Sequence, residues 1–231
     1  MSGTTRPRSI AYDRQTLRHP NPFARFAHVR RHKTAVRFAT RYLAPHGSIL
    51  DVGAGTGALL GEIGAARPDV TCTAFEPYMA LSAPGLRHVT ALDVLQHHSV
   101  DVVSAFEVFE HLTPSRVDGC LAEVKRLLKP DGHFIVSVPI MEGIALPLKE
   151  GSRAILFRRS SDYSGAELIA GMFGRAVART ENPLVSHKGF SHRGLAARLA
   201  SDFRLIERRF SPFPWLPWWM NSQVFLVLRH P

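Results

Sequence analysis

The sequence predicts a single α/β domain with a Rossmann-like, seven-stranded, mostly parallel sheet, helices on both faces and an antiparallel last strand. Two observations predict this class. Short apolar, strand-like segments alternate with segments of helical periodicity through residues 48–139. The first strand runs directly into a glycine-rich turn that opens a helix. A chain of 231 residues is enough for one α/β domain with a full core and short for two.

We expect residues 1–22 to form a flexible basic arm, because three prolines interrupt them. Residues 23–231 then form one domain. It begins with a basic helix in 23–46, for which Pro45 and Gly47 provide the end, and continues with a core of strands and helices in 47–139. The expected strands of this core cover residues 48–52, 70–75, 87–92, 100–106 and 133–138, and its helices cover 56–66, 78–83 and 114–128.

The segment after this core is longer than an ordinary connection between elements. We therefore expect residues 140–190 to form an insertion on the substrate side, with a helix over 165–178. Residues 191–231 should then supply a helix started by Ser191 and two antiparallel strands, at 203–210 and 223–229. Between those strands, residues 211–220 hold three prolines and all three tryptophans, which we expect to wall the acceptor site or to fill core and turn positions.

The net charge of +10 is concentrated at the N-terminal end. Residues 1–46 hold ten Arg or Lys and one acidic residue, Asp13, so the rest of the chain is almost neutral. Such a segment can attract the phosphates of nucleic acid, a lipid surface or an anionic substrate. A solvated leader without a partner is the alternative.

Cysteine usage and hydropathy indicate the compartment. Cys72 and Cys120 lie in different expected elements, so we expect no disulfide and a reducing environment. No apolar stretch is long enough to cross a bilayer, and the N-terminus lacks a hydrophobic signal core. We expect a cytoplasmic protein, with peripheral contact at the inner face of the membrane suggested by tryptophans near basic groups.

The strongest motif is Ile49-Leu-Asp-Val-Gly-Ala-Gly-Thr-Gly57, in which a buried strand enters a glycine-rich turn. Gly53 permits the tight turn, Gly55 lets the backbone approach a ligand, and Gly57 lets the helix start close to the sheet. The helix N-terminus offers free N–H groups to an anion. Its G-x-G-x-G spacing differs from the G-x-G-x-x-G of dinucleotide sites, which disfavours a nicotinamide-dependent oxidoreductase.

Two carboxylates complete this constellation. Glu76 ends the second expected strand, where its side chain can accept both ribose hydroxyl protons of an adenosine ligand. Asp93, after the third strand, can accept from the adenine amino group. A tight strand–helix turn without a ligand would not explain the matched Glu76.

These motifs resemble those of class I methyltransferases that use S-adenosylmethionine (SAM). The resemblance includes Phe75-Glu76-Pro77, Ser104-Ala-Phe-Glu-Val-Phe-Glu-His-Leu112 and Leu128-Lys-Pro-Asp-Gly132, in the family's order. Residues 189–199 also resemble the late helix of small-molecule and saccharide methyltransferases. The resemblance implies SAM as cofactor, S-adenosylhomocysteine as product, and a cofactor site made of Asp51, Gly53, Ala54, Gly55, Gly57, Glu76, Pro77, Asp93, Val94, Phe106 and Glu107.

Glu107, Glu110 and His111 form a Glu-x-x-Glu-His cluster, whose three side chains share one side of a helical turn. The cluster is similar to one in quinone-pathway O-methyltransferases and in small-RNA terminal 2′-O-methyltransferases, where it is linked to Mg²⁺. Similar strings also occur in methyltransferases without a known metal. We favour that second interpretation, in which Glu107 lines the cofactor pocket, and assign no metal ligand, while a divalent cation such as Mg²⁺ stays an alternative.

Methyl transfer from a sulfonium is an in-line displacement that needs position and electrostatics rather than a protein nucleophile. For a hydroxyl acceptor, a base within hydrogen-bond reach helps, and we predict His111 as the first candidate and His187 as the second. The expected reaction is O-methylation of a small-molecule, saccharide or lipid-linked acceptor, which can be anionic.

Two other functions stay open. The basic arm and the Glu-x-x-Glu-His cluster are compatible with an RNA 2′-O-methyltransferase, although no separate RNA-binding module and no aromatic–basic stacking pattern is found. The second open function is that of a subunit without catalytic activity, which keeps the SAM-binding fold and acts as a partner or a sensor.

Overall fold

The computed structural model describes residues 22–157, 160–183 and 186–230. The predicted basic arm falls on residues 1–21, outside the described residues, except for Pro22, with which the first described helix begins. Throughout the described part of the chain, no helix combines the length and the hydropathy needed to span a membrane. Cys72 and Cys120 are both free, as expected.

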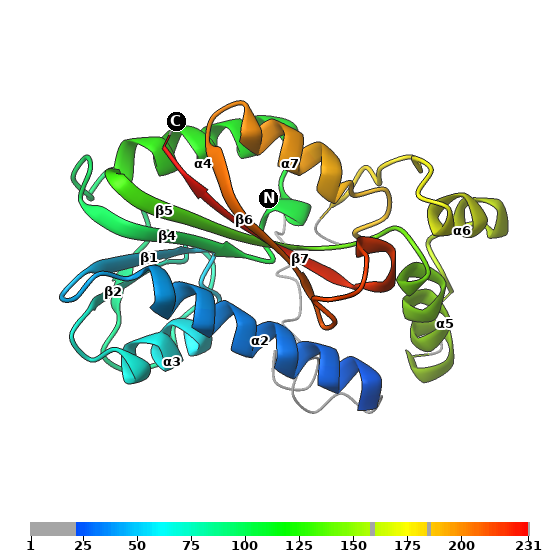
Figure 1. The fold of residues 1–231 in the computed structure, drawn as a ribbon, viewed down its shortest axis with the longest axis horizontal. Coiled ribbons are helices and arrows are strands. Elements are labelled where there is room, and N and C mark those ends of the chain that lie inside the picture. The colour runs from blue at the N-terminus through cyan, green and yellow to red at the C-terminus, as the bar shows by residue number, and fades with distance from the viewer. Residues whose placement is uncertain (1–21, 158–159, 184–185, 231) are drawn as a thin grey trace, which may run out of the picture.

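A seven-stranded sheet with the order β3-β2-β1-β4-β5-β7-β6 forms the centre of the molecule (Figure 1). The neighbours of β1 and β4 pair in parallel, whereas β7 runs antiparallel to both β5 and β6. The predicted fold class is therefore confirmed, including the antiparallel last strand. The strands are β1 (Ser48–Val52), β2 (Thr71–Phe75), β3 (Arg87–Val89), β4 (Val100–Phe106), β5 (Leu128–Pro139), β6 (Arg204–Ser211) and β7 (Gln223–Arg229).

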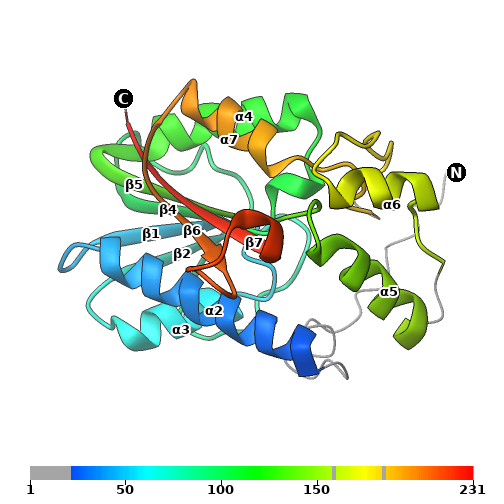
Figure 2. The same cartoon turned by 45° about the vertical axis from the view of Figure 1, so that its right-hand side comes forward.

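Helices cover both faces of this sheet. In Figures 1 and 2, α2 (Pro22–Tyr42) and α3 (Ala58–Ala66) lie on one face, and α4 (Pro114–Leu127) and α7 (His192–Ala200) lie on the other. Each face has its own buried apolar cluster. On the α2 side, the Phe38 ring lies 5.7 Å from that of Phe225, a fully buried residue of β7. This contact fixes the basic helix to the sheet.

The insertion contains two helices, α5 (Ala145–Phe157) and α6 (Gly165–Met172), beyond the carboxyl ends of the parallel strands (Figure 2). α6 starts with a capping box between Ser164 and Glu167, and it ends earlier than predicted, because the chain turns at Gly174 with φ of 71°. Its predicted range of 165–178 was thus too long. α5 was not predicted, because Pro147 and Gly151 weaken its local helix signal.

Three core elements also differ from expectation. No helix forms at 78–83. The amides of Ser82 and Ala83 donate to the Thr56 carbonyl of the glycine turn, and not to the carbonyls four residues earlier as a helix requires. The third strand stops at Val89 rather than at residue 92, since β3 is an edge strand with a single neighbour. β5 begins earlier than predicted, since Leu128 already pairs with Val100 before an irregularity in the register.

The Phe225 contact makes a prediction about stability. Phe225→Ala should lower the free energy of unfolding by about 3–5 kcal/mol, because it removes a fully buried ring between α2 and the sheet. Urea denaturation measures this loss. As a control, Phe173→Ala changes a ring that is 72% exposed and should cost far less; equal losses for the two variants would contradict the packing described here.

Candidate functional site

The glycine-rich turn after β1 is fixed by backbone hydrogen bonds. The amides of Gly53 and Ala54 both donate to the Phe75 carbonyl, at 2.9 and 3.3 Å. Gly53 has φ of 71°, and a Cβ there would lie 2.8 Å from the Val108 side chain. At Gly55, by contrast, a Cβ would meet no atom of the described residues within 4 Å. The turn therefore has no room for a side chain at Gly53 and leaves space next to Gly55.

Glu76, directly after β2, connects two segments of this edge. Its Oε2 accepts from the Gly55 amide at 2.9 Å, and its Oε1 accepts from the amides of Tyr78 and Met79 at 2.9 and 3.2 Å. The side chain is buried, so these charge-assisted hydrogen bonds offset the loss of water. A carboxylate offers about four acceptor positions. Glu76 thus holds the glycine turn and keeps acceptor capacity toward a ligand.

Asp51, in β1, is a second buried acid of this edge. Its Oδ1 accepts from the Ser104 hydroxyl of β4 at 2.6 Å, and the carboxyl is 4% exposed. The pKa of Asp51 is raised to about 7, chiefly by burial; the Ser104 hydrogen bond acts to lower it, and the nearby charge of Glu76 acts to raise it. A cationic ligand group at this position would favour the charged carboxylate.

The predicted cofactor residues all fall at the carboxyl ends of the first four strands or in the loops that follow them. Pro77, Asp93 and Val94 are exposed, while Phe106 is half-buried and its ring lies 6.4 Å from that of Phe225. These positions after β1 to β4 hold the predicted set: Asp51, Gly53, Ala54, Gly55, Gly57, Glu76, Pro77, Asp93, Val94, Phe106 and Glu107.

Glu107 has contacts that the sequence did not predict. It has a left-handed φ of 58°, a conformation that costs a side-chain residue energy and often marks a functional site. Its Oε2 accepts from the Arg31 guanidinium of α2 at 2.8 Å, and its Oε1 accepts from the Gln223 amide of β7. Glu107 therefore links the turn after β4 to the N-terminal helix and to the last strand.

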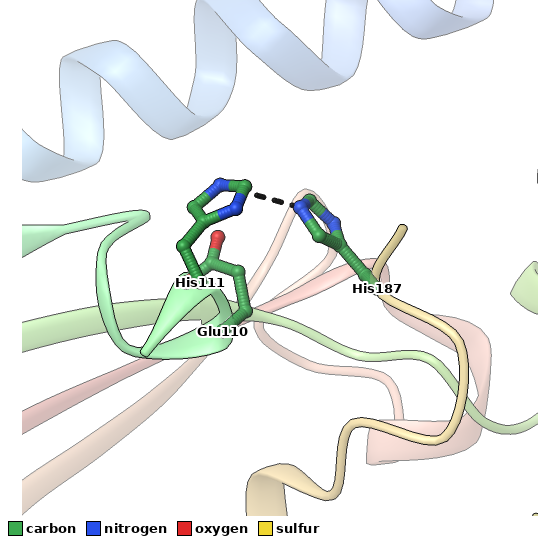
Figure 3. A group of neighbouring side chains, drawn as sticks. All are labelled: Glu110, His111 and His187. Atoms are coloured by element: carbon green, nitrogen blue, oxygen red, sulfur yellow. Dashed lines mark hydrogen bonds between the residues drawn. The ribbon is translucent and has the colours of Figure 1, made fainter. Parts of the chain in front are cut away.

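His111 and His187 meet across the site, with Glu110 beside them (Figure 3). Glu110 and His111 belong to the short turn η1 (Phe109–His111), and His187 precedes α7. The two Nε2 atoms lie 3.3 Å apart, and one donor atom from each of the three residues lies within 4.8 Å of the others. The structure thus brings together both predicted base candidates, which are far apart in the sequence.

The tautomer of His111 follows from its other contact. His111 Nδ1 lies 3.1 Å from the backbone carbonyl oxygen of Pro183. Because a carbonyl oxygen can only accept, Nδ1 carries the proton, and the neutral ring then has a lone pair on Nε2. That lone pair is directed toward His187.

Glu110 is fully buried, and neither of its carboxylate oxygens has a hydrogen-bond partner among the described residues. Burial raises its pKa well above the usual range, and the charge of Glu107 adds to this effect. Arg179 donates to the Glu110 backbone carbonyl at 2.6 Å and its guanidinium lies 5.1 Å from the Phe190 ring. An acidic group without partners beside two imidazoles is costly for folding alone, which points to a ligand or a proton partner.

Lys149 of α5 is a site residue that sequence reasoning missed. Its Nζ donates to the carbonyls of Ile140 and Ser222, at 3.0 and 3.1 Å. Burial lowers its pKa to about 8, while Glu107 and Glu110 act to raise it. The adjacent pair Lys149-Glu150 in a mostly apolar segment was the available signal, since charged side chains inside such segments are seldom buried without a role.

Another late histidine, His192, and the tryptophans of residues 211–220 lie outside this cluster. His192 is buried against the Trp218 ring at 5.7 Å, and burial lowers its pKa to about 4. Trp218 itself packs under Arg193, whose guanidinium lies 4.0 Å from the ring centre. Trp215 is 72% exposed. His192 is therefore outside the Glu110–His111–His187 cluster, and the tryptophans have separate surroundings.

The sequence matches one family model, that of a methyltransferase domain, over residues 23–161. This match spans more than half of the chain and includes the glycine turn, Glu76 and the Glu107–His111 turn. The chain belongs to this methyltransferase family. No curated protein matches the methyltransferase in a direct sequence search.

Solved structures share the fold of this methyltransferase at low sequence identity. The PH0226 protein from Pyrococcus horikoshii OT3 is 13% identical, with a TM-score of 0.61 and coverage of 96% of this chain and 97% of that one. A geranyl diphosphate C-methyltransferase from Streptomyces coelicolor, solved with Mg²⁺, geranyl diphosphate and S-adenosylhomocysteine, is 11% identical (TM-score 0.52; coverage 87% and 79%). A 1,6-didemethyltoxoflavin N1-methyltransferase from Burkholderia thailandensis, with bound S-adenosylhomocysteine, is 21% identical (TM-score 0.50; coverage 85% and 78%).

The raised pKa of Asp51 makes stability depend on pH. The folded state holds this proton more tightly than the unfolded chain, where an aspartate titrates near about 3.9. The stability contributed by the protonated carboxyl is therefore fully present below the unfolded value and is lost as the pH rises through about 7.

Ligand-free Asp51→Asn should thus match the parent protein in acid and become more stable than it at alkaline pH. Urea unfolding at about pH 5 and about pH 8 measures the difference. Asp131→Asn, which alters a side chain that is 98% exposed, is the control and should show no such trend. A stability difference at Asp51 that does not change with pH would contradict the assignment.

Proposed function

We propose that this methyltransferase transfers the methyl group of SAM to a hydroxyl oxygen of a small-molecule, saccharide or lipid-linked acceptor. SAM would lie across the carboxyl ends of β1, β2 and β4. The space above Gly55, the acceptor capacity of Glu76 and the buried Asp51 support this position. Fold relatives solved with S-adenosylhomocysteine support the same cofactor.

Each end of SAM has a chemical complement here. The ribose hydroxyls would donate to Glu76, and the cationic amine of the methionine part would lie near Asp51, whose charged form it would favour. The carboxylate of the methionine part would face the amides at the start of α3. Asp93 and Val94, in the loop after β3, remain the predicted adenine contacts.

The observation that carries oxygen as the acceptor atom is the His111 tautomer. With Nδ1 donating to Pro183, Nε2 is the basic nitrogen of His111, and the contact it makes with His187 at 3.3 Å would give way to an acceptor hydroxyl. A hydroxyl needs such a base, whereas a nitrogen with its own lone pair does not. SAM, when bound, would supply the methyl group to the acceptor oxygen, and the electron pair of the broken carbon–sulfur bond would stay on sulfur. The hydroxyl proton moves to His111, with His187 next to it at 3.3 Å.

The Glu110–His111–His187 cluster also fits a divalent cation. Nitrogens that bind one tetrahedral zinc ion at about 2.0–2.1 Å lie about 3.4 Å apart, and the two Nε2 atoms are separated by 3.3 Å. Glu110 would supply a carboxylate oxygen that has no other partner among the described residues, and the Pro183 carbonyl would orient His111 from behind. When bound, such an ion would take the Nε2 lone pair of His111, so it would replace the general base and would act by lowering the pKa of an acceptor hydroxyl.

This donor set differs from the Glu107-containing one considered from the sequence. Glu107 already accepts from Arg31 and Gln223, so His187 takes its place in the cluster. Two imidazoles and one carboxylate suit Zn²⁺, Mn²⁺ or Fe²⁺ better than Mg²⁺, which prefers oxygen ligands.

Metal binding can be measured without the reaction. Titration calorimetry of the metal-stripped protein with Zn²⁺ and with Mn²⁺ should give one site, which His187→Gln weakens by about 10-fold or more. His97→Gln removes an exposed histidine outside the cluster and should leave this affinity unchanged. If His187→Gln binds as the parent protein does, the cluster is not the site.

The cofactor and acceptor halves of the proposal are separable by mutation. Glu76→Ala should abolish SAM binding in titration calorimetry, because it removes the ribose acceptor and the hydrogen bond that holds Gly55. His111→Gln should retain SAM affinity within about 3-fold and lower turnover by about 100-fold or more, as expected for loss of a general base. Unchanged SAM affinity in Glu76→Ala would overturn the cofactor site. Unchanged turnover in His111→Gln, assayed with labelled SAM after an acceptor screen, would overturn the base.

A further inference from the structure

A basic groove lies between α2 and the end of β6, on the outer side of the N-terminal helix. Its volume is about 100 Å³. Figures 1 and 2 both show the β6–β7 connection lying against α2. The residues that line the groove include four cations and two prolines: Arg30, Lys33, Thr34, Arg37, Arg209, Phe210, Ser211, Pro212 and Pro214.

The four cations of this groove lack ion-pair partners in the described part of the chain, although other cations of α2 have them. Arg31 pairs with Glu107, and Arg41 pairs with Glu207. Among the residues that the structure describes, no acidic one lines the groove. Arg30, Lys33 and Arg37 are spaced so that they follow one side of the helix, and Arg209 faces them from β6. Cations gathered this way repel one another, and an anion relieves that repulsion.

An exposed aromatic rim borders the groove. The Phe26 ring of α2 lies 6.0 Å from that of Phe213, whose ring lies 5.9 Å from that of Trp215. Phe26 is 46% exposed and Trp215 is 72% exposed. Trp219 and Met220, a few residues further on, are also exposed. Large apolar side chains that remain this exposed beside unpaired cations are typical of surfaces that contact the membrane interface.

We propose that this groove and its aromatic rim dock the enzyme on an anionic phospholipid surface. Headgroup phosphates would occupy the groove between α2 and β6, while Trp215 and Phe26 would enter the interfacial region. The aromatic rim favours a bilayer over nucleic acid, because Phe26 and Phe213 contact each other instead of presenting free faces to bases.

The position of the groove connects it with the reaction. Arg30 lines the groove, and the next residue, Arg31, contacts Glu107 in the candidate site, so one helix separates the two. A docked enzyme would hold its acceptor side near the headgroups, where a lipid-linked acceptor is found. This link to the acceptor rests on the proposed function, whereas membrane binding itself does not.

Vesicle flotation tests the docking directly, without SAM or an acceptor. The probes are vesicles of phosphatidylcholine alone and of phosphatidylcholine with one third phosphatidylglycerol. The parent protein should float with the anionic vesicles at low salt, lose this binding as salt is raised, and ignore neutral vesicles. The groove variant Lys33→Ala/Arg37→Ala/Arg209→Ala keeps the Arg31–Glu107 pair and should bind about 100-fold more weakly, at about 5-fold for each cation.

Two further variants separate the groove from general charge. Arg116→Ala/Arg204→Ala/Arg208→Ala removes the same charge from three exposed arginines that do not line the groove, and its binding should change by less than about 5-fold. Trp215→Ala should weaken vesicle binding by about 5-fold or more while keeping all four cations. Titration with SAM reports whether each variant is folded, because none of these residues belongs to the cofactor edge.

Two outcomes would overturn the docking proposal, and a third would affect only the proposed function. Equal losses in the two triple variants would show attraction by net charge and not by the groove. Binding to inorganic phosphate or to RNA that depends on the groove, without vesicle binding, would assign it to a free anion or a nucleic acid. Loss of methyl transfer with vesicle binding retained would instead count against the proposed function and leave the docking surface intact.

Discussion

The Glu76 carboxylate is the interaction on which the candidate site depends most. It accepts the Gly55 amide from the turn after β1 and two further amides from the segment after β2. Because a buried carboxylate must be paired or solvated, this one acid couples the conformations of two loops that belong to neighbouring strands. The glycine turn, the space above Gly55 and the side chain that would receive a ribose are therefore one structural unit.

Behind this unit lies a second layer of charge, on the side where an acceptor would bind. Glu107 and Glu110 repel each other, and Arg31 and Lys149 approach them from α2 and α5. The balance is incomplete, since Glu110 keeps two carboxylate oxygens without partners in the described residues. Stability alone would favour an apolar side chain at that position. Partial compensation of buried charge is common where a protein must bind a charged or reactive partner.

The N-terminal helix α2 contributes residues to the candidate site and to the basic groove. Its apolar side packs on the sheet through Phe38 and Phe225, and Arg31 extends from it to Glu107. Its outer side carries Arg30, Lys33 and Arg37 into the basic groove. A helix with three such sides can couple events at a surface to events at the site, because it has few ways to move without disturbing the core contacts.

The sequence by itself determined the fold class and predicted the glycine turn with its acidic partner, because those depend on local patterns. Strand and helix periodicity, glycines at 53, 55 and 57, and a carboxylate after the second strand all act within a few residues or across neighbouring parallel strands. Only the tertiary structure brought His187 to His111 and placed Lys149 and Arg31 beside Glu107. It also left both carboxylate oxygens of Glu110 without a hydrogen-bond partner among the described residues. Those contacts join residues separated by tens of positions, and Lys149 and His187 belong to an insertion whose path no local pattern encodes. Local propensity determines the strands, the helices and the glycine turn of this protein, whereas long-range packing determines which charged side chains are buried together.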